Sequence, residues 1–236
     1  MKNIIGINRH HNGTTSVVKD GKTIFAIEEE RLNRWKYEGI PFLGIIQSKK
    51  FIKSIDGLIL SGFLPLNNVE HNDRGESHTI YSLVASRIFL ENDLFLTHDF
   101  SNEHHLTHAA GSFYNSNFDK SLSIVIDGAG SRKGILSEKL ESYSSYLFEY
   151  PCKVEVIEKS YFNKNLTIDK ENMLSLGRMY SILTDHFGFN GEHDCGKTMG
   201  LSSYGKKIDI DFVDFFQSSV LNKVNKNHAL YKESKN

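Results

Sequence analysis

The fold is decided by residues 3–27, NIIGINRHHNGTTSVVKDGKTIFAI. This stretch holds three short runs of β-branched and apolar residues, at 3–7, 14–19 and 22–27. Asp20-Gly21 between the second and third runs is a strong signal for a tight hairpin turn, and the polar segment His-Asn-Gly turns the first hairpin. The chain is therefore predicted to open with a three-stranded antiparallel meander.

After the meander, helical and strand patterns alternate. We expect helices at about 42–52, 80–89 and 103–114, and strands at 57–61, 94–97 and 122–126. This order predicts an α/β fold in which helices flank a mixed sheet. Later patterns predict strands near 143–150 and 153–160, a helix at 175–187, a loop at 188–204 and an amphipathic stretch at 210–224. The order resembles the actin, Hsp70 and sugar-kinase superfamily, with ribonuclease H-like lobes whose two turns clamp nucleotide phosphates.

Composition excludes several classes of protein. The chain has 236 residues, 24% of them charged, and a net charge of −1, so nothing indicates nucleic-acid binding or an acidic tail. Cys152 and Cys195 are too few and too far apart for a disulfide framework, which fits a reduced, cytoplasmic location. No stretch approaches the roughly 18 consecutive apolar residues of a membrane span, and the first apolar run is too short for a signal peptide.

The most informative candidate for chemistry is the pair His104 and His108. On a helix, two histidines four residues apart point from the same face and can bind one metal ion. Farther along, a predicted strand delivers the carboxylate of Asp127 and then a glycine-rich turn. Two nitrogens and one oxygen would leave open positions for a substrate. With 11 histidines in the chain, such a pair also arises by chance, so packed histidines without a metal are the alternative.

Two more segments have both a functional and a plain structural interpretation. The first turn, with His11, Asn12 and Gly13, offers backbone amides for an anion and an imidazole for general base catalysis, or it is a solvated hairpin. The segment 28–37 is, on composition, a charged surface stretch, and its functional interpretation is that Lys36 or Arg34 reaches an anionic substrate.

A third segment, 196–205, holds three glycines and a lysine among its ten residues. It is not a P-loop, because the spacing of that motif is absent. The glycines indicate a backbone that passes close to a ligand, or an ordinary glycine-rich loop.

Several short segments follow one another in a specific series. They are Gly6-Ile7, His11-Asn12-Gly13, Asp20-Gly21, Glu28 to Arg31, His104-His105-x-x-His108-Ala109-Ala110, Asp127-Gly128, Leu176-Gly177-x-x-Tyr180 and Gly196 to Gly205. The series resembles the N-terminal part of the O-carbamoyltransferases that modify nodulation factors and antibiotics. A whole series is far more specific than any one segment, and residues 1–205 carry the resemblance.

The resemblance implies an enzyme that makes a carbamoyl adenylate from ATP and carbamoyl phosphate and passes the carbamoyl group to a hydroxyl or amine acceptor. By motif position, it implies a divalent metal, often Fe2+, held by His104, His108 and Asp127. It also implies catalytic roles for His11 and Lys36. Phosphate binding falls on Asn12, Gly13, Gly128 and Gly130.

The sequence also departs from the family. Asn12 stands where the family usually has Asp, and family chains continue well beyond residue 236. We therefore expect a first actin-like lobe at 1–130 and the incomplete remainder of the N-terminal domain at 131–236. Such a chain is a fragment, half of a split enzyme or a degenerate relative, and it needs a complementing subunit or a homo-oligomer to act on its small-molecule acceptor. The alternatives are a non-catalytic metal- and nucleotide-binding subunit, or an actin-like lobe with packed histidines.

Overall fold

The computed structural model describes residues 2–9, 12–62, 88–89, 96–100, 102–134, 137, 139–163, 176–191 and 193–206. The chain forms two compact units, Met1–Thr107 and His108–Asn236. The boundary between the units falls inside a continuous helix. The predicted domains, 1–130 and 131–236, stay a prediction.

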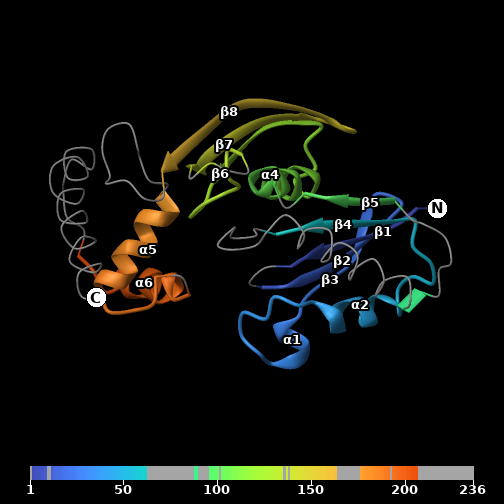
Figure 1. The fold of residues 1–236 in the computed structure, drawn as a ribbon, viewed down its shortest axis with the longest axis horizontal. Coiled ribbons are helices and arrows are strands. Elements are labelled where there is room, and N and C mark those ends of the chain that lie inside the picture. Colours follow the sequence, from blue (N-terminus) through green and yellow to red (C-terminus); the bar gives the residue numbers. More distant parts are fainter. Residues whose placement is uncertain are drawn as a thin grey trace. The chain divides into compact units, whose positions relative to one another are not determined.

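The first unit contains a five-stranded mixed sheet (Figure 1). Its strands are β1 (Asn3–Asn8), β2 (Thr14–Lys19), β3 (Lys22–Glu28), β4 (Gly57–Ser61) and β5 (Leu96–Asp99). They are arranged in the order β3-β2-β1-β4-β5. β1 pairs antiparallel with β2 and parallel with β4, and β4 pairs parallel with β5. The predicted antiparallel meander and the mixed sheet are therefore confirmed.

The core of this unit follows from the two-residue period of its strands. Ile5 pairs with Val17 on one side and with Leu58 on the other, and all three side chains are fully buried. Ile45 of helix α2 (Phe42–Ser48) belongs to the same hydrophobic cluster. Each such side chain stabilises the fold by about 1.5–3 kcal/mol relative to exposure. Burial on this face therefore sets the strand register, since a slip of one residue would turn the apolar side chains outward.

Glu29 corrects the expectation that 28–37 is a charged surface stretch. Its side chain is 2% exposed. Its two carboxylate oxygens accept hydrogen bonds from the backbone amides of Leu43 and Gly44, both at 2.9 Å, in the first turn of α2. A carboxylate there satisfies amides that have no partner within the helix and interacts favourably with the helix dipole. One acid of the run is thus buried as a helix cap, and a short helix, α1 (Glu30–Asn33), follows it.

We expect Glu29→Ala to destabilise the fold by about 2 kcal/mol, because it leaves two helix-end amides without their charged acceptor. Urea unfolding followed by circular dichroism measures the change. Glu28→Ala is the matched control, because the pair between Glu28 and Arg31 at 3.5 Å is exposed, and exposed pairs contribute about 1 kcal/mol or less. Equal stability of the two variants would contradict the capping role.

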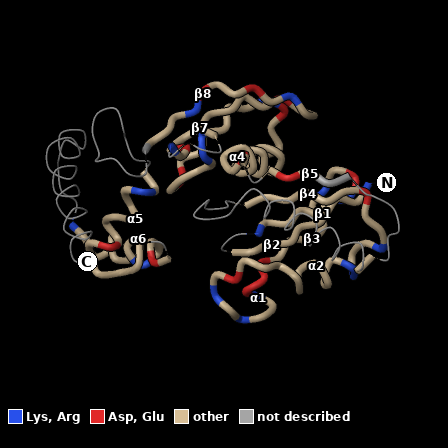
Figure 2. The backbone as a smooth tube through the Cα atoms, in the orientation of Figure 1, with Lys and Arg blue, Asp and Glu red and all other residues tan. Residues whose placement is uncertain are grey.

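The second unit contains a three-stranded antiparallel sheet, β6 (Lys120–Ile126), β7 (Lys139–Glu149) and β8 (Lys153–Asn163), in that order. Phe113 of helix α4 (His104–Tyr114) packs on Phe148 of β7, with ring centroids 5.0 Å apart. Both lysines and glutamates lie along β8 (Figure 2), so neither sign of charge predominates there.

Two expectations for this region are wrong. β6 does not continue the first sheet, because it pairs along its whole length with β7, the next strand in the sequence. The predicted loop at 188–204 contains helix α6 (Cys195–Ser202), which follows helix α5 (Leu176–His186). Its glycines lower helix propensity by only about 1 kcal/mol each, and packing offsets this cost: Thr198 is buried, and the Cys195 thiol donates a hydrogen bond to the Gly191 carbonyl at 3.2 Å.

The other predicted elements agree closely with the structure where it describes them. The helix predicted at 175–187 is confirmed as α5, and the helix at 103–114 as α4. The helix predicted at 80–89, apart from residues 88–89, and the stretch at 210–224 lie outside the described residues. None of the helices within the described ranges has the length and hydrophobicity that crossing a bilayer requires.

Candidate metal centre

The structure brings His104, His108 and Asp127 together. The two histidines lie one helical turn apart on α4, and Asp127 directly follows β6. One ligand atom from each residue can be chosen so that all three lie within 4.8 Å of one another. His108 Nε2 and Asp127 Oδ2 lie 3.6 Å apart.

This donor set fits a divalent transition metal. Imidazole nitrogen and carboxylate oxygen bind such ions at about 2.1 Å, so two ligand atoms on one ion are at most about 4.2 Å apart. The observed 4.8 Å spread therefore needs only a small inward rotation of the side chains. The His108 and Asp127 side chains are 54% and 36% exposed, so an ion held there is accessible to a substrate.

In the metal-free chain, a proton on His108 interacts with the same carboxylate. Hydrogen bonding to Asp127, together with its charge, raises the pKa of His108 above 6.5, although partial burial of the imidazole opposes the change. The folded state thus favours the protonated imidazole. This pair stabilises the metal-free fold fully below about pH 6.5, and the contribution is lost as pH rises through the raised folded-state pKa.

We expect Asp127→Asn to lower the pKa of His108, because the amide cannot match the charge of the carboxylate. An NMR titration of the imidazole resonances in the metal-free protein measures this change. The other histidines serve as an internal control and should titrate alike in both proteins. A His108 pKa that is the same in the unaltered chain and in the variant would contradict the pairing.

The turn after Asp127 is anchored to β7. The Gly128 amide donates to the Asp127 Oδ1 atom at 2.6 Å, and the Gly130 amide donates to the Glu141 carbonyl at 2.8 Å. The Ser131 amide donates to Glu141 Oε2 at 3.0 Å. These bonds occupy the amides of the two glycines expected to bind phosphate, so phosphate binding there stays a prediction.

In the first unit, the turn between β1 and β2 is linked to the segment that contains Lys36. The Gly13 amide donates to the Glu38 carbonyl at 2.7 Å. Glu30 Oε2 accepts hydrogen bonds from the Asn12 side chain at 3.5 Å and from the Tyr37 amide at 3.2 Å.

These hydrogen bonds hold the first turn next to the segment that contains Lys36. Lys36 is exposed within this segment. Asn12 has a φ of 60°, a left-handed conformation that Asn tolerates better than most residues. His11 lies outside the described residues. The element order predicts a single mixed sheet, but β1, which precedes the His11 turn, and β6, which precedes the Gly128 turn, belong to different sheets.

Comparison with known proteins identifies the family. The model of the carbamoyltransferase N-terminus matches residues 68–236. The chain belongs to this carbamoyltransferase family. The resemblance drawn from the short segments is thereby confirmed, and it extends into residues beyond 205, where the sequence motifs showed none.

Relatives of this chain come from diverse organisms. The nodulation protein NolNO of Sinorhizobium fredii is 30% identical over 83% of this chain and 28% of its own length. The uncharacterized protein MJ1051 of Methanocaldococcus jannaschii is 31% identical over 88% of this chain and 34% of its own. The uncharacterized protein sll1178 of Synechocystis is 26% identical over 90% and 36%. The chain thus spans about a third of the length of these relatives.

Among solved structures, an N-acetylglucosamine kinase from Porphyromonas gingivalis aligns with 98% of this chain and 71% of its own. The TM-score is 0.34 and the identity 11%, which is too low a similarity to support any argument about fold or function.

Sequence reasoning missed several residues that shape the site. Glu29 and Glu30 belong to the charged run, yet Glu29 caps a helix and Glu30 links the first turn to its neighbouring segment. Glu141 was not singled out, although it is 1% exposed and holds the Asp127 turn. The available signal is an acid in the interior of a strand whose other interior side chains, from Leu140 to Phe148, are apolar or carry a hydroxyl.

Proposed function

We propose that this chain supplies the metal-binding part of an ATP- and carbamoyl-phosphate-dependent carbamoyltransferase. The enzyme would form a carbamoyl adenylate and transfer the carbamoyl group to a hydroxyl or amine of a small-molecule acceptor. The observation that carries the proposal is the group His104, His108 and Asp127 in a chain of the carbamoyltransferase N-terminal family.

In this proposal, His104, His108 and Asp127 hold a divalent metal, with Fe2+ as the expected ion. The ion would supply positive charge that neutralises phosphate oxygens of the nucleotide. The hydrogen bonds to Glu141 would keep the turn that follows Asp127 in place. The exposed imidazole and carboxylate leave one side of the group open to substrate.

The first turn would contribute the remaining chemistry of this chain. His11 would act as the base that takes the proton of the acceptor, and Lys36 would bind the anionic carbamoyl donor. Asn12 and Gly13 would present polar groups to phosphate oxygens, with Gly128 and Gly130 contributing from the second turn. The hydrogen bonds of Glu30 and Glu38 support a joint role for the first turn and the Lys36 segment.

We also infer that the five-stranded sheet belongs to an actin-like, ribonuclease H-like lobe, with 1–130 and 131–236 as the functional divisions. The meander followed by parallel strands β4 and β5 supports this lobe. Strand β6 supports the need for a complementing subunit or a homo-oligomer, because three apolar side chains of this edge strand are more than half exposed in the described part of the chain. They are Leu122, Ile124 and Ile126.

The proposal is tested by supplying the chain with the C-terminal part of a longer relative and following transfer of labelled carbamoyl groups to candidate sugars, nucleotides or antibiotics. Transfer that requires both ATP and carbamoyl phosphate supports the enzyme. Metal and nucleotide binding without any transfer would favour the non-catalytic subunit instead.

A further inference from the structure

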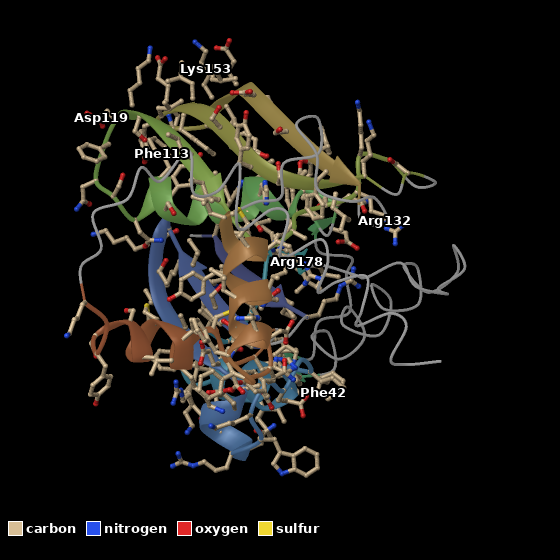
Figure 3. All side chains as sticks on the ribbon, turned by 90° about the vertical axis from the view of Figure 1, so that its left-hand side faces the viewer. Phe42, Phe113, Asp119, Arg132, Lys153 and Arg178 are labelled. Carbon is tan, nitrogen blue, oxygen red and sulfur yellow. The ribbon has the colours of Figure 1, made fainter. Side chains whose placement is uncertain are left out.

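Gly177 lies directly against the backbone that carries the proposed carboxylate ligand. It is the second residue of helix α5, next to Arg178, which Figure 3 labels. A Cβ atom at Gly177 would be 2.6 Å from the Gly128 nitrogen, 2.7 Å from the Asp127 carbonyl carbon and 2.9 Å from the Asp127 carbonyl oxygen. All three neighbours are backbone atoms, so no flexible side chain can move aside. Only a residue without a Cβ allows this close approach.

The backbone of the Asp127 turn cannot readily shift to relieve such a clash. Its far end is bound to Glu141 through the amides of Gly130 and Ser131, at 2.8 Å and 3.0 Å. Glu141 is itself buried, and its other oxygen pairs with Lys159 Nζ at 2.7 Å. Removing one partner of a buried, paired charge is strongly destabilising. The turn is therefore held between helix α5 on one side and β7 on the other.

The Gly128 nitrogen, which is the atom nearest to an added Cβ, also orients the Asp127 side chain. The Gly128 amide donates to Asp127 Oδ1 at 2.6 Å, and the other oxygen of Asp127 lies 3.6 Å from His108 Nε2. A shift of the Gly128 amide would therefore rotate or displace the carboxylate. This links Gly177 to the metal-binding group through one peptide unit.

We infer that Gly177 is a positioning residue for Asp127: its lack of a side chain lets helix α5 fix the Asp127–Gly128 peptide and so aims the carboxylate at the metal. The inference rests on the proposed function, because it takes Asp127 to be a metal ligand. Residues that orient metal ligands typically change metal affinity by about 10–100-fold when they are replaced.

The test uses the full chain and Co2+, whose visible absorption reports its ligands. Gly177→Ala is expected to weaken Co2+ binding about 10–100-fold and to change the spectrum as water replaces the carboxylate. Gly111→Ala in α4 and Gly200→Ala in α6 are the matched controls, because a Cβ at either position meets nothing within 4 Å. These controls should bind Co2+ as the unaltered chain does.

A double-mutant cycle separates positioning from simple loss of fold. If Gly177 acts through Asp127, Gly177→Ala should cause no further loss of Co2+ affinity in an Asp127→Ala background. In the metal-free protein, Gly177→Ala should also speed hydrogen exchange at the Gly128 amide more than at the Ser131 amide. Equal losses in both backgrounds, or an affinity unchanged by Gly177→Ala, would overturn the positioning role.

Failure of the underlying metal proposal gives a different result. In that case the unaltered chain itself would not bind Co2+, or His104→Ala would bind it equally well. A chain that binds Co2+ through His104 but is unaffected by Gly177→Ala overturns only the role of Gly177.

Discussion

The double variant His104→Ala/His108→Ala is expected to lose the single divalent metal ion that the unaltered chain binds. Removing both imidazoles leaves one carboxylate of the three-ligand group, and one carboxylate cannot compete with water for a transition metal at micromolar concentrations. Elemental analysis of the two purified proteins, after dialysis against iron, cobalt or zinc, measures the change. With three protein ligands, we expect moderate affinity and a coordination shell completed by water.

Other histidines provide the control for this experiment, since the chain contains 11. His186→Ala/His193→Ala removes the same number of imidazoles from exposed positions in the second unit. This variant should retain the metal. Equal metal content in the unaltered chain and in His104→Ala/His108→Ala would show that these two histidines do not form the site.

The second large effect concerns turnover: the 236-residue chain alone is expected to transfer no carbamoyl groups. Catalysis would require a nucleotide, carbamoyl phosphate and an acceptor to be held in one geometry, and such positioning gives effective molarities of about 10⁵ M or more. The chain spans only 28–36% of the relatives that match most of it. Binding residues that the rest of those proteins supplies would be missing, so the three substrates would not be held in the reactive geometry.

Transfer of radiolabel from carbamoyl phosphate in the presence of ATP measures this prediction, and His11→Ala in a reconstituted complex is the control for background hydrolysis. Size-exclusion chromatography with light scattering belongs in the same experiment, because exposed apolar patches mark partner surfaces or promote aggregation. Robust transfer by the monomeric chain would show that these 236 residues already complete the active site.

Local patterns in the sequence were sufficient for most of the secondary structure. The two-residue alternation of Ile5 and Ile7 and the Asp20-Gly21 turn predict the meander because neighbouring strands pair through a tight turn. The four-residue spacing of His104 and His108 likewise determines that both imidazoles leave one face of a helix. These features depend on backbone geometry over a few residues, so they can be predicted without knowing the rest of the fold.

Tertiary structure alone decided which distant residues meet. The burial of Glu29 depends on where helix α2 begins, and the sheet to which β6 belongs depends on its pairing with β7. The approach of Gly177 to the Asp127–Gly128 peptide joins positions that are far apart in the sequence. Sequence periodicity describes one element at a time, whereas these contacts depend on how elements pack, so the ligand types could be predicted from the sequence and the backbone that orients them could not.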